Sequence, residues 1–166
     1  AINNNIATVM SAFNEISGEP ATSSRYYLTD VLRDKLGFDG FVVSDWAAIE
    51  RLKCQGVSDN DLLSATLAIT AGVDMDMVDM LYKNNLPHAL ETGAVSMETI
   101  DKAVYRILSI KFKMGLFDHP YAEGEETSLS LEKAKEITAH SMVLLKNNGV
   151  LPLKKGEKIN ISGPFA

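Results

Sequence analysis

Asp45 and Trp46 are the residues whose chemistry stands out in this sequence. They follow a short apolar run, Phe41–Val43, which begins after Gly40. An apolar run bounded by glycine predicts a strand buried on both faces, as in a parallel sheet. Ligands and catalytic groups of α/β proteins lie at the carboxyl ends of such strands. A carboxylate beside a flat aromatic ring there suits chemistry on a sugar: the acid attacks or stabilises an electron-poor carbon, and the ring faces the sugar's C–H groups.

Both residues also have structural interpretations. An aspartate that ends a strand caps the next helix more often than it catalyses a reaction. Trp46, the only tryptophan, is either a core residue or a stacking surface, and its place directly after Asp45 favours the stacking surface. Residue patterns alone leave these alternatives open.

The composition argues against several classes of function. Hydrophobic residues make up 46% and charged residues 23% of the 166 residues, so a core can form. The net charge is -6 and no Lys/Arg block interrupts it, which argues against nucleic-acid and anionic-membrane partners. No apolar stretch approaches the ~18 residues of a membrane helix. Cys54 is the single cysteine, and His88, His119 and His140 are too scattered for a metal site. We therefore expect no metal and no cofactor.

Hydrophobic periodicity predicts three βα units in a row. Strands are expected over 6–13, 40–44 and 72–77, with helices over about 24–36 and 59–71 between them. The strand midpoints repeat at about 32 residues, the length of a βαβ unit. This repeat favours a (β/α)8 barrel or a doubly wound sheet. No Gly-x-Gly-x-x-Gly loop follows a strand, so the dinucleotide-binding version of the sheet lacks its main support.

The pattern changes beyond residue 77. Pro87 breaks or starts a helix near Leu86–Glu91, and a longer helix runs from a cap at Ser96 to Gly115. The polar segment 116–129 then predicts a linker.

A second domain is predicted after this linker. Ser130 caps a helix that ends at Asn147–Gly149, and a new strand begins over 158–162. These residues are too few to bury a core of their own. Because a buried-type strand also starts almost directly after Ala1, we expect a piece of a longer protein.

Four stretches of the chain resemble glycoside hydrolase family 3, the β-glucosidase and β-xylosidase group. They are Val9–Pro20, Gly37–Trp46 with its Ser-Asp-Trp triplet, Ala71–Met77, and Ser141–Asn147 with Leu151–Leu153. They follow the family's order over essentially the whole chain and are most similar to the bacterial periplasmic β-glucosidase branch. The resemblance implies an α/β fold: about the last three βα units of an incomplete (β/α)8 barrel over 1–115, a linker over 116–129, and the first helix and strand of an α/β sandwich over 130–166.

By this resemblance Asp45 is the nucleophile of a retaining exo-β-glycosidase, and the acid/base glutamate lies beyond Ala166. Phe13 departs from the family, because many relatives carry there a tyrosine whose hydroxyl supports the nucleophile; Phe13 can serve only as a wall. Contacts to the sugar are expected from Trp46, Phe13, Met10 and Met77.

The alternating residues 74–77 keep structural alternatives. Met75 and Met77 can line the pocket mouth, although methionines at a buried strand end more often pack. Asp74 and Asp76 are either inward-facing barrel acids or helix caps.

The expected partners follow from the same resemblance. The substrate is a β-linked oligosaccharide or glycoside of a periplasmic or secreted parent enzyme. Three of eight barrel strands cannot close and leave open edges, so the chain is expected to associate with the rest of the parent enzyme or with itself, and to be inactive alone. The alternative is a non-catalytic α/β module that binds sugar or a protein through the rim formed by Asp45 and Trp46.

Overall fold

The computed structural model describes residues 2–121, 124 and 130–164, and the chain divides into two units, Ala1–Ala122 and Glu123–Ala166. The second unit contains one regular element, α5 (Leu131–Ser141), among its described residues. The elements of the first unit are η1 (Ile2–Asn4), β1 (Thr8–Ser11), β2 (Glu15–Ile16), β3 (Glu19–Pro20), η2 (Ala21–Ser23), η3 (Tyr26–Lys35), β4 (Phe41–Ser44), α1 (Ala48–Arg51), α2 (Asp61–Ala71), α3 (Leu81–Glu91) and α4 (Met97–Lys113).

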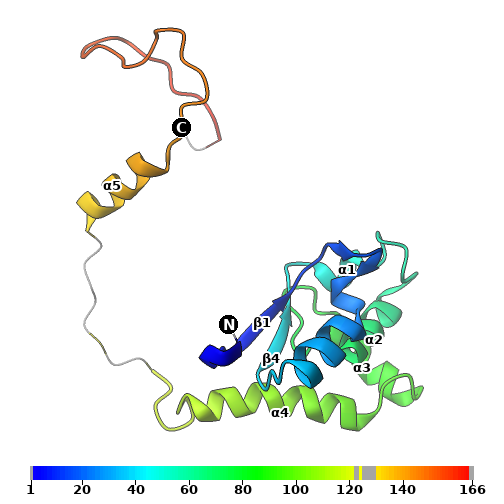
Figure 1. The fold of residues 1–166 in the computed structure, drawn as a ribbon. Helices are drawn as coiled ribbons and strands as arrows, with labels where there is room; N and C mark the ends of the chain where they lie inside the picture. Colours follow the sequence, from blue (N-terminus) through cyan, green and yellow to red (C-terminus); the bar gives the residue numbers. More distant parts are fainter. Residues whose placement is uncertain (1, 122–123, 125–129, 165–166) are drawn as a thin grey trace. The chain divides into compact units, whose positions relative to one another are not determined.

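The first unit contains a parallel sheet of β1 and β4, as the βα repeat predicts, and a separate antiparallel pair of β2 and β3. β1 pairs with β4 in the register Thr8–Phe41 to Ser11–Ser44. Figure 1 shows the two strands side by side, with α1 at the end toward which β1 points and α4 across the opposite end. Gly40 permits this pairing, because a Cβ there would clash with the carbonyl oxygen of Ala7.

The predicted third strand, 72–77, is reduced to one parallel bridge between Val43 and Met75. Side-chain oxygens replace the backbone ladder on both sides of this bridge. The Asp74 carboxylate accepts the Val42 amide, and the Ser44 hydroxyl accepts the Met77 amide, each over 2.8 Å. The segment therefore lies parallel to β4 without forming a regular strand.

The core lies between the sheet and its helices and anchors α1. Val42 of β4, Ile49 of α1, Val73 and Leu52 are fully buried, together with small residues of α2 such as Ala65. Burying an aliphatic side chain stabilises a fold by about 1.5–3 kcal/mol. The short helix α1, which follows Asp45 and Trp46, is thus stabilised by the burial of its side chains, because four residues are too few to form a stable helix alone.

Two helices differ from their predictions: one has a different helix type, and the other begins at a different residue. The helix expected over 24–36 is the π-helix η3, in which the Leu36 amide also donates to the Val31 carbonyl, five residues back, over 3.0 Å. α3 begins at Leu81 and continues through Pro87, so the predicted break or start of a helix at this proline is wrong. The reason is a tertiary cap: the Asp76 carboxylate accepts the Tyr82 amide over 3.0 Å and fixes the helix start before the proline.

α4 begins as predicted, since the Ser96 hydroxyl accepts the Thr99 amide over 3.2 Å. None of the helices in the described ranges has both the length and the apolar character needed to cross a bilayer.

The second unit is less regular than predicted. α5 begins at the predicted cap Ser130 but ends at Ser141, well before Asn147–Gly149. No strand forms over 158–162. A strand needs a partner for its backbone groups, and none lies within the described residues of this unit. The predicted linker over 116–129 falls partly outside the described residues, and the assignment of 130–166 to a sandwich domain stays a prediction.

Candidate active site

Asp45 lies directly after β4, at the sheet edge where the parallel strand β1 also ends. This is the carboxyl edge of the sheet, where α/β proteins place their ligands. The side chain is half-buried and belongs neither to the core nor to the opposite end of the strand. The predicted position of the carboxylate is therefore the observed one.

The register places several predicted residues on one face of the sheet. Met10 pairs with Val43, which also bridges to Met75, so these three form a row across the strands. Asp45 follows the last residue of β4, and Met77 lies two residues beyond the bridged Met75, so both are at the carboxyl edge. The face is open: Met10 is 51% and Met75 45% exposed.

A tight turn fixes the orientation of the Asp45 carboxylate. Oδ1 accepts the amide of Trp46 over 2.6 Å, and the backbone carbonyl of Asp45 accepts the amide of Ala48 over 3.1 Å. Oδ2 accepts no hydrogen bond from the described residues. The helix-capping interpretation of Asp45 is wrong, because α1 receives no cap from the residue before it or from this side chain. One carboxylate oxygen is thus held while the other can meet a ligand.

Trp46 is a surface residue. Its side chain is 63% exposed, so the core interpretation does not hold in this structure. Ala47, which follows, has left-handed backbone with φ 54°, a conformation that is uncommon outside glycine. The turn therefore presents a large aromatic ring beside the carboxylate and changes direction immediately after it.

Phe13 lies in the loop after β1. Its ring is 5.0 Å from the Arg51 guanidinium carbon, and its carbonyl accepts the Gln55 side-chain amide over 2.7 Å. The loop is thereby tied to the region of α1.

Asp74 is neither an inward-facing acid nor a helix cap. Its carboxylate, 1% exposed, accepts Arg33 over 2.5 Å and Arg106 over 2.8 Å. Burial lowers the pKa of Arg33 most, the Asp74 charge opposes this, and the second guanidinium, Arg106, adds to the lowering. The partners come from η3 and α4, 41 and 32 residues away along the chain. Local sequence carries no signal for such a cluster.

Asp76 and Asp79 are tertiary helix caps. Asp76 caps α3, as one of the two alternatives predicted. Asp79, which sequence reasoning missed, accepts the amide of Glu50 in α1 over 3.0 Å. Burial raises the pKa of Asp79 most, and the charges of Asp76 and Glu50 raise it further. A capping residue is recognised in the sequence by the helix that follows it. Asp79 gave no such pattern, because the helix that it caps, α1, lies before it in the chain.

The described residues contain no group of three or more histidine, cysteine or acidic side chains arranged to hold a metal ion. At this edge the half-buried Asp45 is followed directly by the exposed aromatic ring of Trp46.

Comparison with known proteins places this arrangement in a family. Residues 1–110 match the model of the glycosyl hydrolase family 3 N terminal domain. The periplasmic β-glucosidase of Salmonella typhimurium is 40% identical over 170 residues, which covers 95% of this chain and 22% of that protein. A β-xylosidase of Formosa agariphila is 34% identical over 178 residues, covering 97% of this chain and 25% of that protein.

The solved β-glucosidase of Listeria innocua in complex with glucose has the same fold. It superposes with a TM-score of 0.75 at 36% identity, over 92% of this chain and 22% of that one. The chain thus spans about a fifth to a quarter of the length of these relatives. The predicted resemblance is confirmed: this chain belongs to glycoside hydrolase family 3.

Proposed function

We propose that this chain is a segment of a retaining exo-acting β-glycosidase, similar to a β-glucosidase, and that Asp45 is its nucleophile. The observation that carries the proposal is the place of Asp45 at the carboxyl edge of the parallel pair β1–β4, directly before the exposed Trp46. Membership of family 3, whose similar members here are named β-glucosidase and β-xylosidase, supports it.

The reaction follows from the chemistry of two carboxyl groups about 5–5.5 Å apart. Oδ2 of Asp45 attacks the anomeric carbon, the bond from that carbon to the leaving oxygen breaks, and a glycosyl ester forms on Asp45. A second carboxyl group protonates the leaving oxygen and then takes a proton from the water that hydrolyses the ester. We assign this acid/base residue to a part of the parent enzyme outside the chain.

The neighbouring side chains have supporting roles in this proposal. Trp46 offers a flat surface to the sugar ring. Phe13 closes the side next to α1, where its ring already contacts Arg51. Met10 and Met77 provide apolar surface toward the carboxyl edge, in keeping with the adaptable packing of methionine.

The substrate and setting are proposed from the same relatives. The substrate is a glycoside or oligosaccharide with a terminal β-linked sugar. The parent enzyme is periplasmic or secreted, as the name of the Salmonella typhimurium relative suggests. The fold of the parent is a (β/α)8 barrel of which this chain supplies about three units. The open sheet face and edge are covered by the remaining units or by a second copy.

Covalent labelling tests the proposed nucleophile. The full-length enzyme that contains this segment is treated with an activated 2-fluoro-β-glucoside, digested, and analysed by mass spectrometry. We expect the label on the peptide that contains Asp45, and Asp45→Asn should lose labelling and nearly all turnover of an aryl β-glucoside. Asp59→Asn, an exposed acid without a role in the site, is the matched control and should label normally.

The same experiment separates the second candidate, a non-catalytic module. The 63% exposure of Trp46 favours a sugar-binding rim even without chemistry. Reversible binding of the fluoroglycoside without a covalent adduct would support the module and reject the nucleophile. A label on a different carboxylate would reject the assignment to Asp45.

A further inference from the structure

Residues 77–80, here called the rim loop, bond to the chain on both sides of Asp45. The first amide of the rim loop donates to the hydroxyl of Ser44, the residue before Asp45, over 2.8 Å. The carboxylate of Asp79 accepts the amide of Glu50, in the helix after Asp45, over 3.0 Å. Ser44 is fully buried, so the first of these bonds is shielded from water.

Helix α1 depends on the rim loop for its cap. Its N-cap residue, Ala47, has left-handed backbone and a methyl side chain that cannot accept a hydrogen bond. A local capping side chain would also require extended backbone at this position. Asp79 supplies the missing acceptor from outside, since the amide of Glu50 donates to its carboxylate over 3.0 Å. α1 begins three residues after Asp45, so this cap fixes the end of the nucleophile's turn.

Strained backbone surrounds the capping carboxylate. Among the described residues, five non-glycine residues have positive φ, and three of them are Ala47 (54°), Val78 (77°) and Met80 (58°). Val78 is an outlier because it is β-branched. Such conformations cost about 1–3 kcal/mol each and persist where the surrounding structure over-determines them.

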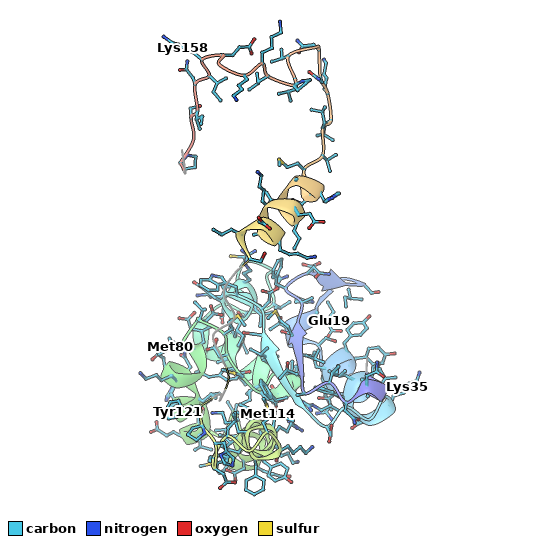
Figure 2. The ribbon with its side chains drawn as sticks, turned by 90° about the vertical axis from the view of Figure 1, so that its left-hand side faces the viewer. Glu19, Lys35, Met80, Met114, Tyr121 and Lys158 are labelled. Atoms are coloured by element: carbon cyan, nitrogen blue, oxygen red, sulfur yellow. The ribbon has the colours of Figure 1, made fainter. Side chains whose placement is uncertain are left out.

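Burial of the flanking side chains does not account for this strain. Val78 and Met80 are each 50% exposed, and Met80 is labelled at the surface of the first unit in Figure 2. The group that these two residues hold in place is Asp79. Burial raises the pKa of Asp79, so its charge is disfavoured there. A strained loop that retains a disfavoured carboxylate at the rim of a site is characteristic of function.

We propose that Asp79 is a positioning residue for Asp45. By tying the start of α1 to the rim loop, it sets the orientation of the turn from which the Asp45 carboxylate reaches the substrate. This inference rests on the proposed function. A misplacement of about 1 Å costs about 100-fold in rate. Loss of the tie should therefore slow the chemical step and leave ground-state binding almost unchanged.

The test uses the full-length enzyme that contains this segment. Asp79→Ala removes the acceptor, Asp79→Asn keeps an acceptor oxygen without charge, and Ser96→Ala removes the cap of α4 as a control for general loss of a cap. The rate of labelling of Asp45 by an activated 2-fluoro-β-glucoside is measured, together with the affinity for a reversible iminosugar inhibitor. Thermal denaturation of each variant checks that it is folded.

We expect Asp79→Ala to label about 10- to 100-fold more slowly, with inhibitor affinity within about threefold of the unsubstituted enzyme. Asp79→Asn and Ser96→Ala should label within about threefold of it. If Asp79→Ala does not fold, Asp79→Glu carries the test, because its carboxylate lies one methylene farther out; we expect labelling to be about tenfold slower. These values follow the same positional argument.

Labelling of both Asp79→Ala and Asp79→Glu at the unsubstituted rate overturns the inference. Equal slowing in Ser96→Ala also overturns it, since any lost cap would then suffice, and so does an Asp79→Asn variant as slow as Asp79→Ala. Absence of any label on Asp45 in the unsubstituted enzyme is a different result. It rejects the proposed nucleophile, and the positioning role falls with it.

Discussion

Backbone groups, rather than a neighbouring side chain, orient the carboxylate of Asp45. The amide of Trp46 holds one oxygen at 2.6 Å, and the turn continues into left-handed backbone at Ala47. Phe13 has no hydroxyl to offer, and its ring instead packs near Arg51. The turn itself, and the bonds that tie it to its surroundings, hold the Asp45 carboxylate in this chain.

Trp46→Ala separates binding from folding at the residue scale. The side chain is 63% exposed, so its removal should change the free energy of unfolding by less than about 0.5 kcal/mol. An aromatic contact is worth about 0.5–1.5 kcal/mol beyond its buried area, which corresponds to an increase in KM of about 2- to 10-fold. Steady-state kinetics of the full-length enzyme that contains this segment, with an aryl β-glucoside as substrate, checks this.

Leu63→Ala provides the comparison, because it also removes an exposed apolar side chain, but one that lies on α2 and not beside Asp45. Its KM should stay unchanged. An unaltered KM in Trp46→Ala would mean that the ring does not contact the sugar.

At the element scale, the Asp74 carboxylate joins segments that are distant along the chain. It binds the Val42 amide of β4, Arg33 of η3 and Arg106 of α4. Arg33 also donates to the Gly40 carbonyl over 2.8 Å, just before β4. The bonds of Asp74 and Arg33 therefore hold the start of β4 in place, and with it the strand that ends at Asp45.

Asp74→Ala should destabilise the fold strongly. It leaves the Arg33 guanidinium, 8% exposed, without its carboxylate and the Val42 amide without its acceptor. Removing one partner of a buried ion pair costs about 3–5 kcal/mol. The free energy of unfolding is measured by denaturing the full-length enzyme, with the loss of activity as the signal for the transition.

Glu98→Ala is the matched control, since it breaks an ion pair with Lys102 on the exposed surface of α4. Surface pairs contribute little, so this variant should unfold like the unsubstituted enzyme. Equal effects of the two substitutions would show that the Asp74 cluster contributes no more than a surface pair.

At the scale of the whole molecule, the parallel sheet of the first unit is open. β1 has a partner strand on one side, and among the described residues no strand pairs with its other edge. The apolar face beside it remains exposed at Met10 and Met75. In the second unit, Ile137, Leu144 and Leu145 are all exposed. Each of these surfaces is of a kind that folded proteins cover.

The isolated 166-residue chain should therefore self-associate and lack turnover. Two parallel strands and one bridged segment cannot close a barrel around a sugar. Light scattering during size-exclusion chromatography should give a mass above that of one chain, and an aryl β-glucoside should not be hydrolysed. A monomer with turnover that disappears in Asp45→Asn would show instead that this segment is sufficient.

Local patterns in the sequence determined most of the elements that position the candidate site. The apolar run Phe41–Val43 predicted β4 and therefore the place of Asp45 at its carboxyl end. The capping serines Ser96 and Ser130 predicted the starts of α4 and α5, because a cap bonds to amides only a few residues away. The motif around Asp45, together with three further stretches in the family's order, predicted the family.

Only the tertiary structure decided the features that depend on distant groups. The carboxylates of Asp74, Asp76 and Asp79 bond to other parts of the chain, and no local spacing reveals which amide or guanidinium each will meet. The shortened third strand and the early start of α3 follow from those bonds. Hydrophobic periodicity reports which face of an element is buried, whereas the partners of a polar side chain are set by the packing of the whole fold.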